Sequence, residues 1–325
     1  MRGINSLERQ TKSDVQGKKE RCHRIIFLYV VDYMKKLLLL LMISMLWPTL
    51  ALAQQLQWST AYTFGRNNLD PAIIPWSSVT HVSHFALWVA NDGSVSGSHL
   101  GLTTTASQAL TAEAHKNGRK AIICVGGYGN GSGFASATTD ANRQKLINNI
   151  VNYMSTYGYD GVDLDWEDGM IASQYLALAR ELRAKLDTIT PRPLMTAAIQ
   201  CWVGASAEIA IIPYTDQANI MSYTVDANGL GNEVGCFVNG GIAKARLGIG
   251  IGLGDGGGVD RSAAAVKAKC DYAKNNSYGG VMQWLIEDDY KANGKTMPWM
   301  AVIAPYVSQP PDSTNPDAPR NLRVK

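Results

Sequence analysis

Apolar and polar residues follow two different periods along this chain, and the change between them recurs over most of its length. From Gln54 to Tyr306, short runs rich in β-branched and aromatic residues are separated by segments whose apolar residues recur at helical spacing. The short runs predict strands at residues 58–64, 81–89, 120–125, 161–166, 194–199, 218–223, 246–252 and 280–285. Eight strands that alternate with helices over about 250 residues predict an α/β fold, a (β/α)8 TIM barrel with one catalytic domain.

Two of the intervening helices are readable in detail. The helix after the third strand is expected to begin at Thr139 as its N-cap and to end at Gly158. Its apolar residues at helical spacing are Leu146, Ile147, Ile150, Val151 and Met154. The following helix stops before Pro191 and carries one apolar face made of Tyr175, Leu178, Ala179, Leu182 and Leu186.

The fourth predicted strand has an unusual alternation. Asp163, Asp165 and Glu167 share one face, because successive side chains of a strand point to opposite sides. Val162, Leu164 and Trp166 share the other face, which we expect to meet the helices. Clustered carboxylates cannot all ionise easily, so at least one should have a raised pKa and serve as a proton donor. An exposed edge strand and a calcium-binding acidic cluster are the alternatives.

The same residues carry a resemblance to a known family. The stretch Asp160-Gly-Val-Asp-Leu-Asp-Trp-Glu167 resembles the DGxDxDxE signature of glycoside hydrolase family 18, the chitinase family. The resemblance extends to an aromatic on strand one, a Gly-Gly motif on strand three, Met-x-Tyr on strand six and Trp on strand eight.

The resemblance implies roles for individual residues. Glu167 would be the acid/base, Asp165 would orient the 2-acetamido group of the sugar, and Asp163 would share a proton with Asp165. Tyr223 would bind the acetamido oxygen, and Trp284 would form the floor of the sugar subsite. The further substrate-binding candidates are Tyr62, Met221, Gln283, Phe85 and Gly127.

Two positions depart from the family pattern. Cys124 stands where the family usually has Ser, and Thr224 stands where it usually has Asp or Asn. Both departures bear on the pKa values of the acidic residues, and neither removes the proton donor.

The reaction that the resemblance implies is retaining hydrolysis of β-1,4 bonds between N-acetylglucosamine units, assisted by the substrate's own acetamido group. Chitin or chitooligosaccharides are therefore the expected partners. An endo-β-N-acetylglucosaminidase acting on N-glycans, an enzyme acting on peptidoglycan and a non-catalytic chitin-binding lectin on the same barrel stay open.

The segment before the barrel resembles an export signal. Residues 1–33 are polar and of mixed charge, and can lie upstream of a true start at Met34. Two lysines, an apolar run and Ala51-Leu-Ala53 predict a signal peptide at residues 34–53, with a retained membrane anchor as the alternative. The first 53 residues hold nine of the 30 Lys and Arg but four of the 27 Asp and Glu. The remainder is thus slightly acidic, which argues against nucleic acid or an anionic membrane as partners and suits a secreted, extracellular monomer with a neutral substrate.

The His, Cys and Gly-rich sequences elsewhere in the chain predict no metal site and no cofactor site. The His and Cys spacings match no zinc pattern, and an exported protein allows a Cys201–Cys236 disulfide, both residues being expected in loops. Residues 252–257 satisfy GxGxxG, but a dinucleotide fold wants that motif at the first βα turn, whereas here it follows the seventh strand.

The connections at the end of the chain are short. Residues 254–280 have room for a loop and one helix, without a sizeable α+β insertion, so we expect an open groove and endo action. The barrel domain is expected at residues 54–306. Residues 307–325 are Pro-rich and read as a linker followed by the truncated start of a fibronectin type III module, or as a disordered tail.

Overall fold

The computed structural model describes residues 32–36, 55–202, 205–254 and 258–309. The chain divides into two units, Met1–Gln54 and Gln55–Lys325. In the first unit residues 32–36 are helical. The expected leader at 34–53 and the expected extension at 1–33 lie almost wholly outside the described residues, as do residues 310–325. None of the described helices is long and apolar enough to cross a membrane.

The second unit is a closed barrel of parallel strands, as the sequence predicts. The strands are β1 (Trp58–Phe64), β2 (His81–Val89), β4 (Lys120–Gly126), β5 (Gly161–Asp165), β6 (Leu194–Ile199), β7 (Gln217–Ile220), β8 (Leu247–Gly252) and β9 (Gly280–Trp284). Each strand pairs with its neighbours in chain order, and β1 pairs with both β2 and β9, which closes the ring. A two-residue strand that was not predicted, β3 (Val95–Ser96), pairs antiparallel with the end of β2.

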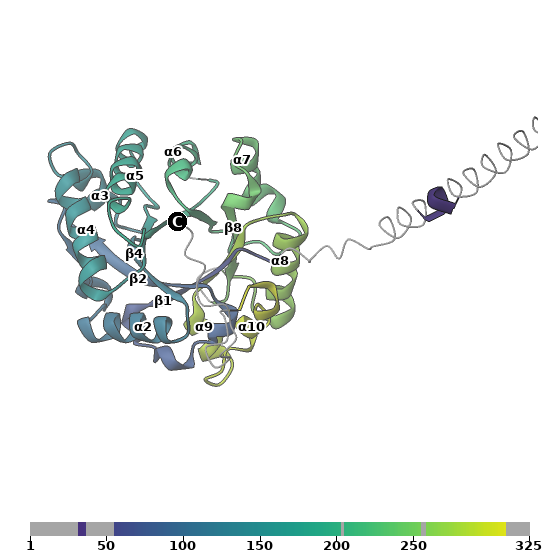
Figure 1. The fold of residues 1–325 in the computed structure, drawn as a ribbon. Coiled ribbons are helices and arrows are strands. Elements are labelled where there is room, and N and C mark those ends of the chain that lie inside the picture. Colours follow the sequence, from purple (N-terminus) through teal and green to yellow (C-terminus); the bar gives the residue numbers. More distant parts are fainter. Residues whose placement is uncertain (1–31, 37–54, 203–204, 255–257, 310–325) are drawn as a thin grey trace, which may run out of the picture. The chain divides into compact units, whose positions relative to one another are not determined.

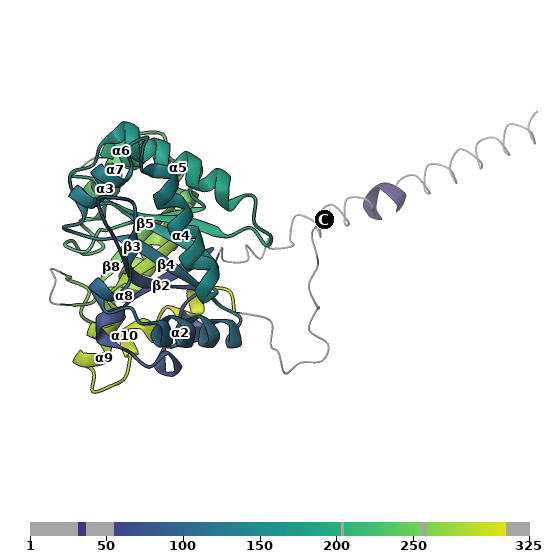
Figure 2. The same ribbon diagram turned by 90° about the vertical axis from the view of Figure 1, so that its left-hand side faces the viewer.

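Helices surround the strands in the part of the chain that the structure describes (Figures 1 and 2). They are α2 (Thr104–Lys116), α3 (Gly131–Ala137), α4 (Arg143–Tyr157), α5 (Ala172–Leu186), α6 (Ala205–Ile211), α7 (Leu230–Asn239), α8 (Ala263–Asn275), α9 (Ile286–Ala292) and α10 (Pro298–Ala301). Short 3-10 turns lie at Gly65–Asn67, Pro71–Ile73, Trp76–Ser78, Ser98–Leu100, Ile212–Tyr214, Lys244–Arg246 and Ala304–Tyr306.

On β5 the apolar side chains and the acidic side chains lie on opposite faces, as expected. Val162, Leu164 and Trp166 are buried on the side of the helices. The Trp166 ring stacks on Phe134 of α3 at a centroid distance of 4.9 Å and lies 5.3 Å from the ring of Tyr175 on α5. The opposite face of β5 is therefore left for the acidic residues, inside the ring of strands.

Two predicted boundaries are wrong by more than one residue. The helix expected to begin at Thr139 begins at Arg143, because the Thr139 carbonyl accepts hydrogen bonds from the amides of Asn142 and Arg143 in a turn that precedes α4. Its end is as expected, with Gly158 at φ 74°. The strand expected to reach Tyr223 ends at Ile220, whose carbonyl accepts a hydrogen bond from the Ser222 amide and so leaves the ladder.

The connection between β8 and β9 is short, as expected. In its described part, from Gly258 onward, it holds α8 and no further helix or strand before β9. The GxGxxG stretch follows β8, the seventh strand of the barrel, and its residues 255–257 lie outside the described residues. The motif therefore does not occupy the turn after the first strand, where a dinucleotide-binding fold holds the phosphates.

The two ends of the barrel segment are joined to each other. Leu56 and Val307 form a parallel bridge, and the Leu56 amide donates to the Tyr306 carbonyl at 2.8 Å. Arg119, which precedes β4, donates to the Ser308 carbonyl at 2.9 Å. Both ends thus lie where the strands begin, at the face opposite the strand C-termini.

The expected disulfide between Cys201 and Cys236 is present, with the two Cα atoms 5.8 Å apart. Cys201 follows β6 as expected, but Cys236 lies on α7 and not in a loop. Cys124 and Cys270 are buried free thiols.

Candidate active site

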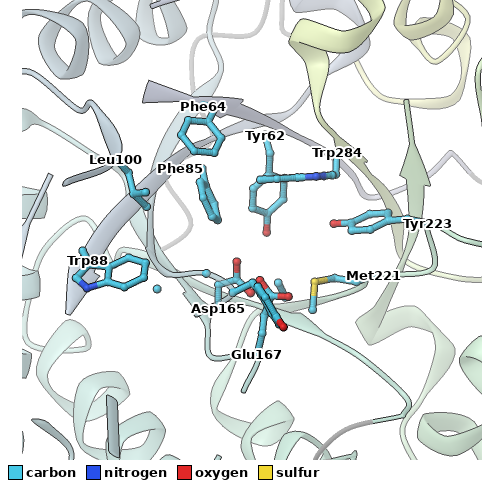
Figure 3. A pocket seen from close by; sticks show the side chains of 14 residues that line it. Tyr62, Phe64, Phe85, Trp88, Leu100, Asp165, Glu167, Met221, Tyr223 and Trp284 are labelled. Carbon is cyan, nitrogen blue, oxygen red and sulfur yellow. The ribbon is translucent and has the colours of Figure 1, made fainter. Parts of the chain in front are cut away.

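The C-terminal ends of the strands surround a pocket of about 360 Å³ (Figure 3). Barrel enzymes place their chemistry at this face. Seven of its fourteen lining residues are aromatic, and Asp165 and Glu167 supply its carboxyl groups. Its lining residues are Tyr62, Phe64, Phe85, Trp88, Leu100, Gly126, Gly127, Tyr128, Asp165, Glu167, Ala198, Met221, Tyr223 and Trp284.

The aromatic wall is built around Trp284 at the end of β9. Its ring meets the edge of Phe85 at a centroid distance of 4.9 Å and that of Tyr62 at 5.8 Å. Figure 3 shows Tyr62, Trp284 and Tyr223 on the side of the pocket opposite Asp165 and Glu167. A flat apolar surface that faces carboxyl groups is suited to a sugar ring, which has apolar C–H faces and polar edges.

Asp163 lies beneath the pocket and is held by neutral donors. The Tyr62 hydroxyl donates to its Oδ2 at 2.7 Å, and the Thr196 hydroxyl donates to its Oδ1 at 2.5 Å. Burial raises the pKa of Asp163 to about 6, and the hydrogen bonds from Thr196, Tyr62 and Cys124 oppose that rise. These donors are uncharged, and in the part of the chain that the structure describes no Lys or Arg is paired with Asp163, so its ionisation depends on the hydroxyl and thiol donors.

Asp165 is the least compensated of the three acids. Its Oδ1 is buried and has no hydrogen-bond partner among the described residues, and Cys124 Sγ is 3.9 Å from its Oδ2. Burial, followed by the charges of Glu167 and Asp163, raises the pKa of Asp165 well above its usual value. A polar hydrogen of a ligand would therefore find a ready acceptor at Oδ1.

Glu167 lies two residues beyond the end of β5, at the pocket. Burial raises the pKa of its carboxyl to about 7, while a hydrogen bond from the Tyr128 amide opposes the rise and the charge of Asp168 adds to it. A carboxyl group with this pKa carries a proton near neutral pH and can give it up to a basic oxygen.

Tyr223 faces the pocket from the segment after β7. Its hydroxyl donates to Met282 Sδ at 3.1 Å and not to an acidic residue. Burial and the nearby carboxyls of Asp165 and Glu167 raise the pKa of Tyr223 well above its usual value, so the phenol stays neutral and available as a donor.

Most of the residues singled out from the sequence come together here. Tyr62, Phe85, Gly127, Asp165, Glu167, Met221, Tyr223 and Trp284 line the pocket, with Asp163 directly beneath. Gln283 does not line it. On β9 the side chains of Met282 and Trp284 face inward, so Gln283 faces the other side, where its amide donates to Ser59 Oγ at 3.1 Å. We therefore leave Gln283 out of the proposed site.

Several lining residues were not singled out from the sequence. Phe64 and Trp88 are aromatic and lie at or next to the ends of β1 and β2, which is a signal that could have found them. Tyr128 is 81% exposed at the rim. Thr196 was also missed, although it is the β6 neighbour of Asp163 in the sheet register and so the natural donor to it.

The two departures from the family pattern have different outcomes. Cys124 is the β4 neighbour of Asp163 and lies among the acids, where its thiol is a weaker donor than a hydroxyl. Thr224 does not line the pocket. Among the described residues no group of three or more His, Cys, Asp or Glu is placed to hold a metal ion.

Comparisons with known proteins give the same picture. The sequence is 26% identical over 147 residues to Chitinase 1 of Aphanocladium album and 29% identical over 147 residues to Endochitinase 1 of Metarhizium anisopliae, in each case covering 38% of this chain and 34% of the relative. These matches span about a third of each relative's length. The crystal structure of Ostrinia furnacalis Group IV chitinase has the same fold, with a TM-score of 0.66 and 16% identity, over 77% of this chain and 99% of that one.

The sequence pattern of Glycosyl hydrolases family 18 matches residues 57–233, which is more than half of the chain and includes β1 to β7 with all three acids. The chain belongs to glycosyl hydrolase family 18.

Proposed function

We propose that this protein is a chitinase that hydrolyses β-1,4 bonds between N-acetylglucosamine units with retention. The observation that supports this most is the pairing of Glu167, whose pKa is about 7, with Asp165, whose Oδ1 has no partner among the described residues. One group can give a proton to a glycosidic oxygen, and the other can receive an N–H group from the sugar.

The proposed reaction has two steps. Glu167 protonates the bridging oxygen while the substrate's acetamido oxygen attacks the anomeric carbon, the leaving sugar departs and a bicyclic cation forms. Asp165 accepts the acetamido N–H and stabilises that cation. Water then gives its proton to Glu167 and opens the ring from the same face. This requires an N-acetyl group at the 2-position of the sugar, which favours chitin over cellulose or starch.

The remaining pocket residues have supporting roles. The Tyr223 hydroxyl turns from Met282 to the acetamido oxygen, and Trp284 stacks under the sugar before the scissile bond. Asp163, which accepts from Tyr62 and Thr196, acts as the neighbour with which Asp165 exchanges a proton.

We further propose endo action and secretion. The short connection between β8 and β9 leaves that side of the pocket without an added domain in the described residues, which suits binding along a chain. The leader-like residues 34–53 support export, and the Cys201–Cys236 disulfide suits an oxidising compartment.

The deciding experiment compares wild type with Glu167→Gln on chitin oligomers of three to six units. We expect the variant to bind the oligomers with a Kd within about threefold of wild type while turnover falls by at least about 10²-fold, because the proton donor is lost. Glu181→Gln on α5, which removes a surface carboxyl that pairs with Arg143, is the matched control and should keep full activity.

The rival functions give different outcomes. Binding without turnover by the wild type would indicate a lectin. Turnover of an N-glycan or of peptidoglycan fragments, with chitin oligomers left intact, would indicate one of the other hydrolases.

A further inference from the structure

The proton donor lies where the sheet no longer holds the chain. The pairing of β5 with β6 ends at Leu164 and Ala197, and the pairing of β5 with β4 ends at Asp165. Glu167 follows two residues later, in a segment that is neither strand nor helix. Its peptide therefore needs other contacts if its carboxyl is to keep a fixed place.

Gln200 supplies such a contact from the next strand. It directly follows β6, is buried, and its side-chain Nε2 donates to the Glu167 carbonyl at 2.7 Å. The last paired residues of β5 and β6 are Leu164 and Ala197, and Glu167 and Gln200 each lie three positions further along. The hydrogen bond from the Gln200 side chain therefore joins the two segments at a point where main-chain pairing between them has ended.

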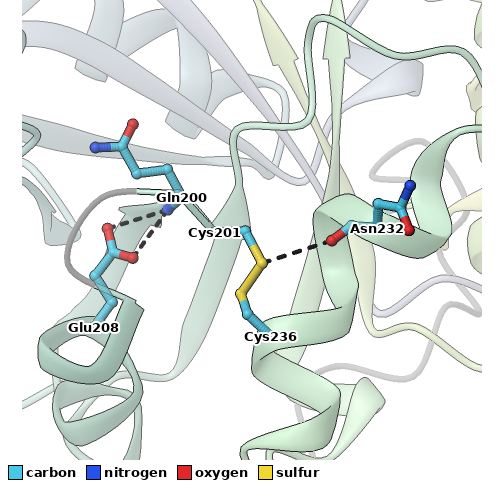
Figure 4. The surroundings of a disulfide bond; sticks show 5 residues. All are labelled: Gln200, Cys201, Glu208, Asn232 and Cys236. Atoms are coloured by element: carbon cyan, nitrogen blue, oxygen red, sulfur yellow. Dashed lines mark hydrogen bonds between the residues drawn. A yellow bond between two sulfur atoms is a disulfide. The ribbon is translucent and has the colours of Figure 1, made fainter.

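Gln200 is itself held from two helices (Figure 4). The carboxyl group of Glu208, on α6, is completely buried, and both of its oxygens accept from the main-chain N–H of Gln200 at 3.1 Å. The next residue, Cys201, is bonded to Cys236 on α7. The peptide at residues 200–201 is therefore fixed by α6 on one side and by α7 on the other.

We propose that Gln200 is a positioning residue for Glu167, and that Glu208 and the Cys201–Cys236 disulfide act on catalysis by holding Gln200. The inference rests on the proposed function, since it assigns Glu167 the proton transfer. A shift of about 1 Å in a catalytic group can cost about 100-fold in rate, so a single amide placed here has a large effect on turnover. We expect substrate binding to depend on the aromatic wall, and Gln200 is not one of the residues that line the pocket.

The first test is Gln200→Leu, which keeps the volume and removes the donor, with Gln200→Asn, which keeps an amide too short to reach Glu167. We expect kcat on chitotetraose to fall about 10- to 100-fold in both variants while KM changes less than about threefold. The matched control is Gln217→Leu. Gln217 is a buried amide at the start of β7, where it accepts from Thr60, and its loss should leave kcat unchanged.

The second test separates the geometry at Glu208 from its charge. Burial raises the pKa of Glu208 to about 9, so this carboxyl is mostly uncharged near neutral pH. Glu208→Gln keeps an oxygen acceptor for the main-chain N–H of Gln200 and should keep most of the activity. Glu208→Leu removes the acceptor and should lower kcat as Gln200→Leu does.

The disulfide is tested by a double-mutant cycle. Replacing Cys201 and Cys236 together by Ser should lower kcat in the wild type but cause no further loss in the Gln200→Leu protein, because the effect passes through Gln200. An equal loss in both backgrounds would show that the disulfide acts by another route and would overturn that part of the proposal.

A substrate-free measurement keeps this inference distinct from the proposed function. We expect carbon-13 NMR to show the Glu167 pKa falling toward its usual value in Gln200→Leu, since a looser segment exposes the carboxyl to water. The idea is overturned if Gln200→Leu leaves both kcat and the Glu167 pKa at wild-type values, or if its kcat falls only as much as that of Gln217→Leu. Absence of turnover in the wild type, with the NMR shift present, would instead count against the proposed function alone.

Discussion

At the scale of single residues, the pKa values of the three acids at alternate positions 163, 165 and 167 differ because their surroundings differ. Asp163 receives two hydroxyl donors, Asp165 keeps one oxygen without a partner among the described residues, and Glu167 receives a main-chain amide at the pocket. Burial raises the pKa of all three. Glu167 both lines the pocket and has a pKa of about 7, and this combination suits it for proton transfer.

The pH dependence of activity follows from Glu167. Its proton must be present for the first step, so kcat/KM should decline as the pH rises through about 7, the pKa of this carboxyl. The measurement is kcat/KM for chitotetraose across the pH range from about 4 to 9. A profile that is flat from pH 6 to 9 would contradict the role given to Glu167.

The same pKa predicts an effect of Glu167→Gln on stability. The folded state holds a proton on Glu167 that the unfolded chain releases near its usual pKa, so this group lowers stability as the pH rises from about 4.5 to 7. Replacing it by Gln removes that cost, which corresponds to about 3 kcal/mol above pH 7. We expect the Tm of the variant to exceed that of wild type by several degrees at pH 8.

The control for this stability effect is the pH itself. At pH 4 the carboxyl is mostly protonated in both the folded and the unfolded state, and the two proteins should unfold within a degree or two of each other. Equal Tm values at pH 8 would mean that Glu167 ionises freely in the folded protein.

The sequence could predict the residues of the site better than their contacts. Strand alternation was enough to put Asp163, Asp165 and Glu167 on one face, and strand ends were enough to bring Tyr62 and Trp284 near them. Gln283 was wrongly assigned to the site because it lies near the end of β9. Side chains alternate along β9, so Gln283 points away from the pocket when Met282 and Trp284 face inward. Gln200 and Glu208 were missed because a hydrogen bond from a side chain to the main chain of another segment leaves no periodic signal in the sequence.

At the scale of elements, the end of β8 is tied to the segment after β7 by a buried ion pair. Lys269 of α8 has its Nζ 2.7 Å from Asp260 Oδ2, and it also donates to the carbonyls of Ser222 and Gly250. Asp260 in turn accepts from the Gly252 amide. Ser222 directly precedes Tyr223, so this pair fixes the main chain from which a pocket residue projects.

Removal of the Lys269 charge should be costly. Lys269→Met leaves Asp260 buried without its cation and should lower the free energy of unfolding by about 3–5 kcal/mol. Urea denaturation monitored by tryptophan fluorescence measures the change. The double variant with Asp260→Asn should recover part of the loss, and a loss in Lys269→Met below about 1 kcal/mol would show that the pair is not buried in solution.

The sequence pattern predicts some element boundaries correctly and misses others. The strands β1, β2 and β6 begin and end where the apolar runs do, because packing on both faces sets their length. The boundaries at Thr139 and Tyr223 were wrong because local hydrogen bonds decided them. A turn around Thr139 delays α4, and the Ser222 amide ends β7 early.

At the scale of the whole molecule, a closed ring of strands gathers residues that are far apart in the chain. Tyr62 and Trp284 come from the first and last strands and meet only because β1 pairs with β9. The pocket therefore depends on closure of the barrel.

Product analysis on polymeric chitin tests the proposed open groove. We expect early products of several lengths, because a chain that can enter from the side is cut at internal positions and released after few cuts. High-performance chromatography of soluble products at low conversion gives the distribution. A series that begins with dimer alone would contradict internal cutting.

The bridge between Leu56 and Val307 has a consequence for protein engineering. Because the two segments leave the ring side by side and away from the catalytic mouth, a short peptide could join them and new termini could be opened in another surface loop without unravelling the ring. For the same reason, a domain fused next to Leu56 or Val307 would lie at the face opposite the pocket and would not block the pocket entrance.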